Sequence, residues 1–137
     1  MRVYFDSSAF AKRYINEPGT AEVLRWCEQA DELAMSVIAL PEMISAFCRL
    51  QREGRLAPAE YQRIKQDLMA DLADALLCDT TPAALQLAVL ALEASSLRGM
   101  DAIHIAAAQV CEADVFVSAE ARQCAAAQAA GLKVEAL

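Results

Sequence analysis

The sequence predicts an α/β fold: a three-layer α/β/α sandwich with a mainly parallel, five-stranded central sheet. Two observations predict it. Short strand-like runs alternate with helical patterns almost throughout the chain, which is typical of a parallel sheet covered by helices on both faces. The composition is 57% hydrophobic and rich in alanine, which indicates closely packed helices. The 137 residues have the length of one domain and show no linker or repeat, so we expect residues 1–137 to form a single domain.

Five strands are expected from runs of strand-forming residues. The first contains Val3, Tyr4 and Phe5 and ends abruptly at Asp6. In chain order, the five expected strands are residues 2–6, 33–38, 76–79, 114–118 and 132–136.

Helical patterns fill the intervals between the strands. They cover residues 20–30, 40–53, 58–75, 101–112 and 119–130, and a very apolar stretch that begins at Pro82. Thr20 and Thr81 are expected to cap the helices that follow them, and Gly131 is expected to end the last helix. The helix at 20–30 is expected to place Leu24 on its buried side, with Val23, Trp26 and Cys27.

Charge and composition exclude several classes of protein. No run of 18 consecutive apolar residues exists, and Asp6 interrupts any signal-peptide pattern, so we expect a cytoplasmic protein with no membrane span. The five scattered cysteines form no C-x-x-C pair and are expected to be reduced thiols. A net charge of −7 gives no sign of the basic surface that most nucleic-acid binders carry.

Four carboxylates, distant in sequence, are expected to converge. In open parallel sheets, ligands bind at the carboxyl ends of the strands. Asp6 ends the first strand, Glu42 follows the second, and Glu120 follows the fourth. Asp101 opens a helix that must run back along the sheet to feed the fourth strand, so its start lies at the same edge. Ser8 and Ser118 are expected to support this cluster.

Converging carboxylates repel one another unless a proton or a cation neutralises them. Oxygen ligands without a Cys/His cluster favour Mg²⁺ or Mn²⁺. Such an ion activates water and stabilises charge on a phosphoryl oxygen, so cleavage of a phosphodiester is the natural use of the site. Taken alone, each carboxylate is explained at least as well as a turn former or a first-turn helix residue. The shared position at the strand ends favours the functional interpretation.

His104, three residues after Asp101, is the one histidine of the chain. It has the chemistry of a general base, but a helix residue satisfied by a backbone or side-chain partner is the favoured interpretation. Candidate contacts to a polyanion are Lys12, Arg13, Arg49 and Arg98, and each is explained at least as well as solvated helix surface.

Four sequence blocks, in order, resemble the motifs of PIN-domain proteins, in particular the VapC-type toxins of type II toxin–antitoxin pairs. They are YFDSSAFAKRY, SVIALPEMISAF, MDAIHIAAA and ADVFVSAEARQCAAAQAAGLKV. The resemblance covers nearly the whole chain. It implies a PIN-like α/β/α sandwich, a Mg²⁺- or Mn²⁺-dependent ribonuclease site, a homodimer, and a cognate antitoxin whose basic C-terminal segment can occupy the carboxylate pocket.

The resemblance also assigns the site residues. The first three acidic positions of the family match Asp6, Glu42 and Asp101, with Ser8 as the accompanying hydroxyl. The fourth is commonly an aspartate, but the turn here contains Glu120. The longer side chain predicts contact with the ion through water, or orientation of Ser118. Asp6 and Asp101 are therefore the expected metal ligands, and all four carboxylates are the expected catalytic residues.

Two other interpretations are kept open. One is a PIN-like binding module that has lost efficient catalysis, which the glutamate at position 120 and the missing basic stripe favour. The other is phosphoryl transfer to Asp6 as a nucleophile. That chemistry normally uses a second aspartate two residues later, where this chain has Ser8.

Overall fold

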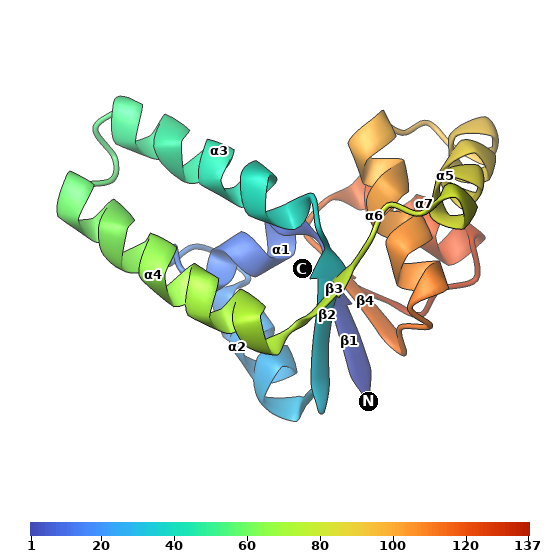
Figure 1. The fold of residues 1–137 in the computed structure, drawn as a ribbon, viewed down its shortest axis with the longest axis horizontal. Coiled ribbons are helices and arrows are strands. Elements are labelled where there is room, and N and C mark those ends of the chain that lie inside the picture. Colours follow the sequence, from blue (N-terminus) through green and yellow to red (C-terminus); the bar gives the residue numbers. More distant parts are fainter.

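The computed structural model describes residues 1–137 and contains one sheet of five parallel strands (Figure 1). The order across the sheet is β3-β2-β1-β4-β5. The strands are β1 (Arg2–Phe5), β2 (Glu32–Ser36), β3 (Leu76–Cys78), β4 (Val115–Ser118) and β5 (Val134–Ala136). All neighbouring strands pair in parallel, which confirms the predicted sheet.

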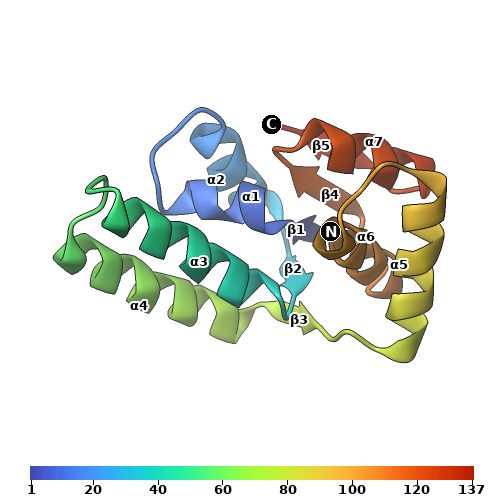
Figure 2. The ribbon, with the colours of Figure 1, turned by 90° about the horizontal axis from the view of Figure 1, so that it is seen from above.

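Helices cover both faces of this sheet (Figure 2). One face carries α1 (Ser7–Phe10), the short 3₁₀ helix η1 (Ala11–Arg13), α2 (Thr20–Gln29), α3 (Ala39–Arg52) and α4 (Pro58–Asp74). The other carries α5 (Pro82–Ala94), α6 (Gly99–Val110) and α7 (Ala121–Ala129). Helices α3 and α4 form a hairpin that projects beyond the sheet, and α5 is the outermost element on the opposite side (Figures 1 and 2). The three-layer sandwich is confirmed.

The local signals for helix ends are confirmed at two of three positions. The Thr81 hydroxyl accepts the N–H of Ala84, and Gly131 has φ 92°, the left-handed conformation that follows many helices. The prediction for Thr20 is wrong. Gly19, with φ 99°, turns the chain so tightly that Thr20 is already the first helical residue, and its hydroxyl donates to the carbonyl of Lys12 instead.

The prediction that Leu24 is buried is also wrong, because α2 turns a narrow stripe toward the sheet. Val23 lies fully inside that stripe, whereas Leu24 is 39% exposed. The helix lies at the margin of the sheet layer (Figure 2), so one row of side chains suffices to pack it.

Two cores lie on the two faces of the sheet, as strand alternation requires. Phe5 and Met35 face the larger core with Phe10, Phe47 and Leu68 of the covering helices. On the other face, Tyr4 and Phe116 stack with ring centroids 5.4 Å apart. A third, small cluster joins α5 to α6 and consists only of the alanines Ala84, Ala88, Ala102 and Ala106.

The topology fixes where a ligand can bind. From β1 the chain builds outward to β2 and β3, then crosses to β4 on the other side of β1. The crevice between the carboxyl ends of β1 and β4 is therefore the switch point of the sheet, where open α/β folds bind ligands.

None of the helices combines the length and the hydropathy needed to span a bilayer. All five cysteines are free thiols.

Candidate active site

A cavity of about 270 Å³ opens at this switch point, and all four predicted carboxylates line it. Asp6 comes from the end of β1, Glu42 from the first turn of α3, Asp101 from the first turn of α6, and Glu120 from the residue before α7. Ser8 also lines the cavity, and Ser118 lies buried behind Asp6. The structure thus brings together every site residue that the sequence predicted.

Asp6 is almost completely buried and held from both sides. Its Oδ1 accepts the N–H of Ala9 and the hydroxyl of Ser8, both at 2.8 Å, so that it caps α1. Its Oδ2 accepts the hydroxyl of Ser118 at 2.5 Å. Burial raises the pKa of Asp6, and the hydrogen bonds from Ser118, Ala9 and Ser8 oppose that rise. The side chain is therefore fixed in one orientation at the floor of the cavity.

The two serines tie the ends of β1 and β4 together. The N–H of Ala119 donates to Ser8 Oγ at 3.3 Å, and the N–H of Glu120 donates to Ser118 Oγ at 3.1 Å. Because both hydroxyls also donate to Asp6, the turn that carries Glu120 is positioned relative to Asp6. Both serines therefore hold the carboxylate of Asp6 by hydrogen bonds.

Glu42 is positioned by a hydrogen-bonded chain that starts in the sheet. The Tyr4 hydroxyl lies 2.8 Å from His104 Nδ1, and His104 Nε2 lies 2.6 Å from Glu42 Oε1. Ser7 donates to the same Oε1 at 2.6 Å. A ring protonated on Nε2 satisfies both contacts of His104. Burial alone would raise the pKa of Glu42, but the hydrogen bonds from His104 and Ser7 bring it below its usual value.

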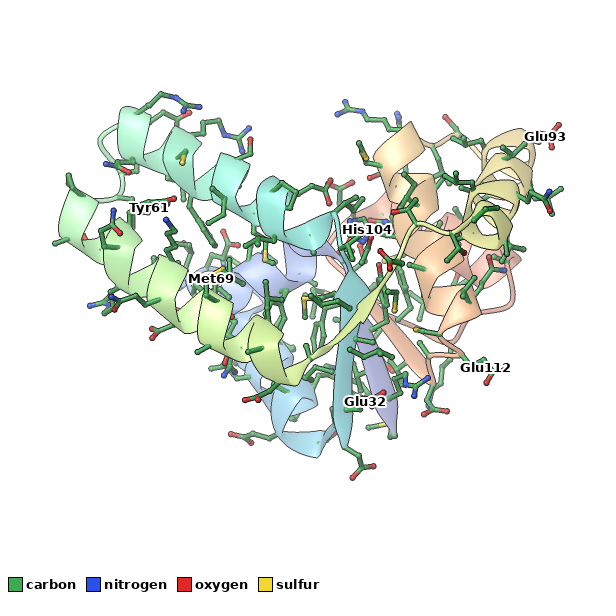
Figure 3. The ribbon with its side chains drawn as sticks, viewed as in Figure 1. Glu32, Tyr61, Met69, Glu93, His104 and Glu112 are labelled. Carbon is green, nitrogen blue, oxygen red and sulfur yellow. The ribbon has the colours of Figure 1, made fainter.

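His104 is therefore buried and satisfied by side chains, as the favoured interpretation expected. It lies over the strand ends, between the start of α3 and the middle of α6 (Figure 3). Its partner is nevertheless a site carboxylate, Glu42, so the histidine positions the site rather than only filling the core. The i, i+3 spacing of Asp101 and His104 places both on the side of α6 that faces the cavity.

Asp101 and Glu120 carry the less constrained carboxylates. Helix α6 is held at its start by Gln123, whose amide donates to the Asp101 carbonyl at 3.1 Å. Burial and then the nearby charges of Asp101 and Asp6 raise the pKa of Glu120, and Arg98 opposes them. The carboxylates are thus close enough to repel one another, as their convergence at one sheet edge predicted.

Sequence reasoning missed two polar residues that line this cavity, Ser7 and Gln123, whereas Arg49, one of the candidate contacts to a polyanion, also lines it. Ser7 stands directly beside Asp6 in the sequence, and Gln123 is a buried polar residue in an alanine-rich helix. Of the other basic candidates, Arg98 lines an adjacent groove. Lys12 and Arg13 are paired with Glu17 and Asp71, outside the cavity.

The donor set suits a hard cation, because it consists of carboxylate and hydroxyl oxygens. No group of three or more His, Cys, Asp or Glu residues is arranged closely enough to hold an ion by protein ligands alone. Mg²⁺ commonly binds through one or two carboxylates and keeps several water molecules. The donor chemistry of the cavity is therefore compatible with such an ion, and the repulsion from Asp101 and Asp6, which adds to burial in raising the pKa of Glu120, is the kind that a cation relieves.

Comparisons with known proteins agree with this geometry. A family model described as PIN domain matches residues 3–129. Ribonuclease VapC45 of Mycobacterium tuberculosis is 31% identical over 106 residues, which cover 77% of this chain and 74% of that protein.

Solved structures share the fold. A structure described as a toxin-antitoxin complex from Klebsiella pneumoniae superposes with a TM-score of 0.67 at 15% identity and covers 90% of both chains. Mycobacterium tuberculosis VapC20, described as a sarcin-ricin loop cleaving toxin, gives a TM-score of 0.68 at 14% identity and covers 95% of both chains.

Proposed function

This chain belongs to the PIN domain family, and from that premise we propose that it is a Mg²⁺- or Mn²⁺-dependent endoribonuclease that acts as the toxin of a toxin–antitoxin pair. The observation that carries the proposal is the meeting of four carboxylates, from four separate elements, on one cavity at the switch point of the sheet. The ribonuclease named among the relatives and the toxin–antitoxin complex among the structural neighbours support it.

Asp6 and Asp101 are the residues that would hold the ion. When bound, a divalent cation stabilises charge on the phosphoryl oxygens and makes water a better nucleophile. Asp6 contributes a carboxylate whose orientation is fixed by Ser8, Ser118 and the amide of Ala9. Asp101 contributes one from the start of α6, across the cavity.

Glu42 is the residue that would orient the attacking water and accept its proton. Its Oε1 is occupied by Ser7 and His104, whereas Oε2 makes no hydrogen bond to the protein. The lowered pKa keeps the group ionised, and the chain from Tyr4 through His104 holds it still. Glu120 would act through water or through Ser118, whose hydroxyl accepts its backbone N–H.

The charges of the cavity and of the whole chain indicate which partners the protein would bind. Arg49 is the basic side chain that lines the cavity, so it would contact the RNA backbone. A net charge of −7 and a carboxylate-lined cavity favour a protein partner with a basic segment, which we propose is the C-terminal segment of the cognate antitoxin. We further propose that the toxin is a homodimer.

RNA cleavage measured with and without a divalent cation tests the proposal. We expect the purified protein to cleave RNA with Mg²⁺ or Mn²⁺ and to lose that activity in excess EDTA, because the carboxylates alone repel a polyanion. Restored cleavage on adding Mn²⁺ back excludes irreversible unfolding. Binding of RNA without cleavage under any of these conditions would instead identify a binding module. Release of inorganic phosphate from a small phosphate ester would point to a nucleophilic Asp6.

Replacing His104 tests whether it positions Glu42 or transfers protons itself. We expect His104→Gln to lower the rate of RNA cleavage by about tenfold, because an amide at this position can still contact Tyr4 and Glu42. Both limbs of the pH–rate profile should remain. Tyr4→Phe, which removes only the hydroxyl at the far end of the chain, is the matched variant and should cost less. If the pH–rate profile of His104→Gln lacks one limb and its cleavage rate falls by about a hundredfold or more, His104 is a general acid or base.

A further inference from the structure

Gln123 is a buried amide in a helix whose other buried residues are small. Its exposed fraction is 2%, and the other buried residues of α7 are Cys124, Ala126 and Ala127. Burying an amide costs free energy unless its donor and its acceptor both find partners. An apolar side chain of similar volume would fill the same space without that cost. The contacts of Gln123 therefore indicate why a glutamine stands here.

The usual explanation of a glutamine at this position is helix capping. Gln123 is the third residue of α7, whose N-cap is Glu120. In a capping box, the side chain of the third residue reaches back and accepts the backbone N–H of the cap residue. In this protein the N–H of Glu120 donates to Ser118 Oγ instead, at 3.1 Å. Gln123 therefore does not cap its own helix.

The amide of Gln123 lies between two elements that carry site carboxylates. Its Nε2 donates to the Asp101 carbonyl at 3.1 Å, and its Oε1 lies 3.5 Å from Ser118 Oγ. The same Ser118 hydroxyl donates to Asp6 Oδ2 at 2.5 Å. The contact with the Asp101 carbonyl is the stronger one, because 3.5 Å is long for an O–H···O hydrogen bond. Gln123 thus connects the start of α6 to the hydroxyl that holds Asp6.

The start of α6 has few other attachments. Arg98, the residue before it, makes no side-chain capping hydrogen bond, and the first two residues of the helix are exposed. Of the side-chain hydrogen bonds in the structure, the one from Gln123 is the one that reaches this first turn. Ala102 packs in the alanine cluster with α5, rather than in the core that α6 shares with the sheet. Because uncapped helix ends open readily, the turn that carries Asp101 depends on Gln123.

The other end of the connection is firmly held. The N–H of Asp6 donates to the carbonyl of Val117 at 3.1 Å, between β1 and β4. The thiol of Cys124, the next residue of α7, donates to the Ser118 carbonyl at 3.6 Å. Helices α6 and α7 lie beside each other on this face of the sheet (Figure 2). Gln123 therefore reaches from a fixed part of the site to a turn that little else holds.

We propose that Gln123 is a positioning residue of the metal site, which holds the Asp101 turn of α6 at a set distance from Asp6. This inference rests on the proposed function, because it takes Asp6 and Asp101 as ligands of one cation. A mobile turn would have to be ordered when the ion binds, and that cost lowers affinity. Gln123 makes no hydrogen bond to either carboxylate, so its effect falls on ion binding rather than on the chemical step.

Calorimetric titration of the full-length variant Gln123→Met with Mn²⁺ tests this role. Methionine keeps the length and the helix propensity of glutamine but removes both hydrogen bonds. We expect Mn²⁺ binding to weaken by about tenfold, as the loss of outer contacts of a metal site usually does. The half-saturating Mn²⁺ concentration for RNA cleavage should rise equally, while the rate at saturation stays within about threefold of wild type. Gln128→Met, the same change at an exposed position of α7, is the matched control and should bind Mn²⁺ as wild type does.

Hydrogen exchange of the backbone amides, measured in EDTA, gives a second readout that needs no metal. Peptides from the start of α6 should exchange about three- to tenfold faster in Gln123→Met than in wild type or Gln128→Met. If Gln123→Met does not fold, Gln123→Asn replaces it, since its amide is one methylene too short to span both contacts. A glutamine that serves stability alone would lower the Tm when replaced and leave Mn²⁺ affinity unchanged.

The proposal requires both changes in a protein that binds Mn²⁺. A folded Gln123 variant with wild-type Mn²⁺ affinity would overturn it, as would weaker binding without faster exchange at the start of α6. Equal weakening in Gln128→Met would also overturn it. If the wild type binds no Mn²⁺, the metal assignment of the proposed function fails. Hydrogen exchange alone then decides whether Gln123 holds this turn, and unchanged exchange would overturn that role too.

Discussion

Asp6→Asn should lower RNA cleavage by about 10³-fold or more while the protein stays folded. The loss corresponds to about 4 kcal/mol of transition-state stabilisation, the scale expected when a charged metal ligand is removed. The fold should tolerate the change because asparagine is also a good helix cap and keeps the acceptor that Ala9 and Ser8 use. The Ser118 hydroxyl can donate to Gln123 Oε1, 3.5 Å away, and its oxygen can accept a hydrogen bond from the side-chain amide of the new asparagine.

Two measurements check this result: calorimetric titration with Mn²⁺ and the rate of RNA cleavage. Asp79→Asn is the matched control. Asp79 also follows a strand directly, at the same edge of the sheet, but it is exposed and does not line the cavity. It should retain wild-type Mn²⁺ binding and cleavage. Undiminished Mn²⁺ binding by Asp6→Asn would remove Asp6 from the metal site.

The fold was predictable because its signals are local and agree with one another. Val3, Tyr4 and Phe5 read as a strand whichever partner they have, and Pro82 after Thr81 marks a helix start without any tertiary information. The two wrong predictions, at Thr20 and Leu24, both concern α2. Its capping depends on the turn at Gly19, and its burial depends on how much of the sheet margin it covers, neither of which a residue pattern contains.

The candidate site was predictable in its members but not in its connections. Parallel strands bring their carboxyl ends to one edge, so topology alone places Asp6 and Glu120 together. The hydrogen-bonded series runs from Tyr4 to His104, 100 positions away in the sequence, and from His104 to Glu42, 62 positions away. It depends on the directions in which these side chains point. Ser7 was missed because its neighbour Ser8 fits the family motif, and only the structure shows that the two hydroxyls hold different carboxylates.

The acidic balance of the chain is also explained by the arrangement of its parts. A basic stripe is missing, yet Arg49 lines the carboxylate cavity and Arg98 lines the groove beside it. Local basic residues together with a bound cation would let an acidic protein approach RNA, whereas a basic antitoxin segment would compete for the same carboxylates.

Asp101→Asn should resemble Asp6→Asn, with a loss of about 10³-fold in cleavage and weaker Mn²⁺ binding, because both would remove one of the two expected metal ligands. Stability should change little. An aspartate in the first turn of α6 interacts favourably with the helix dipole by about 0.3–1 kcal/mol. Its charge also repels Glu120, and this repulsion adds to burial in raising the pKa of that residue. The Asp101 carbonyl that holds Gln123 is unaffected by the substitution.

Glu120→Gln is the matched variant for this prediction, since it removes one carboxylate from the same cavity by the same change of one atom. We expect it to cost only about 10–100-fold, as residues that act on a metal through water usually do. Cleavage rates measured over a range of Mn²⁺ concentrations separate the two roles. Asp101→Asn should shift the half-saturating concentration strongly upward, and Glu120→Gln only slightly. An equal loss in both variants would make Glu120 a direct ligand, whereas an Asp101→Asn rate within tenfold of wild type would leave Asp6 as the one ligand of the pair.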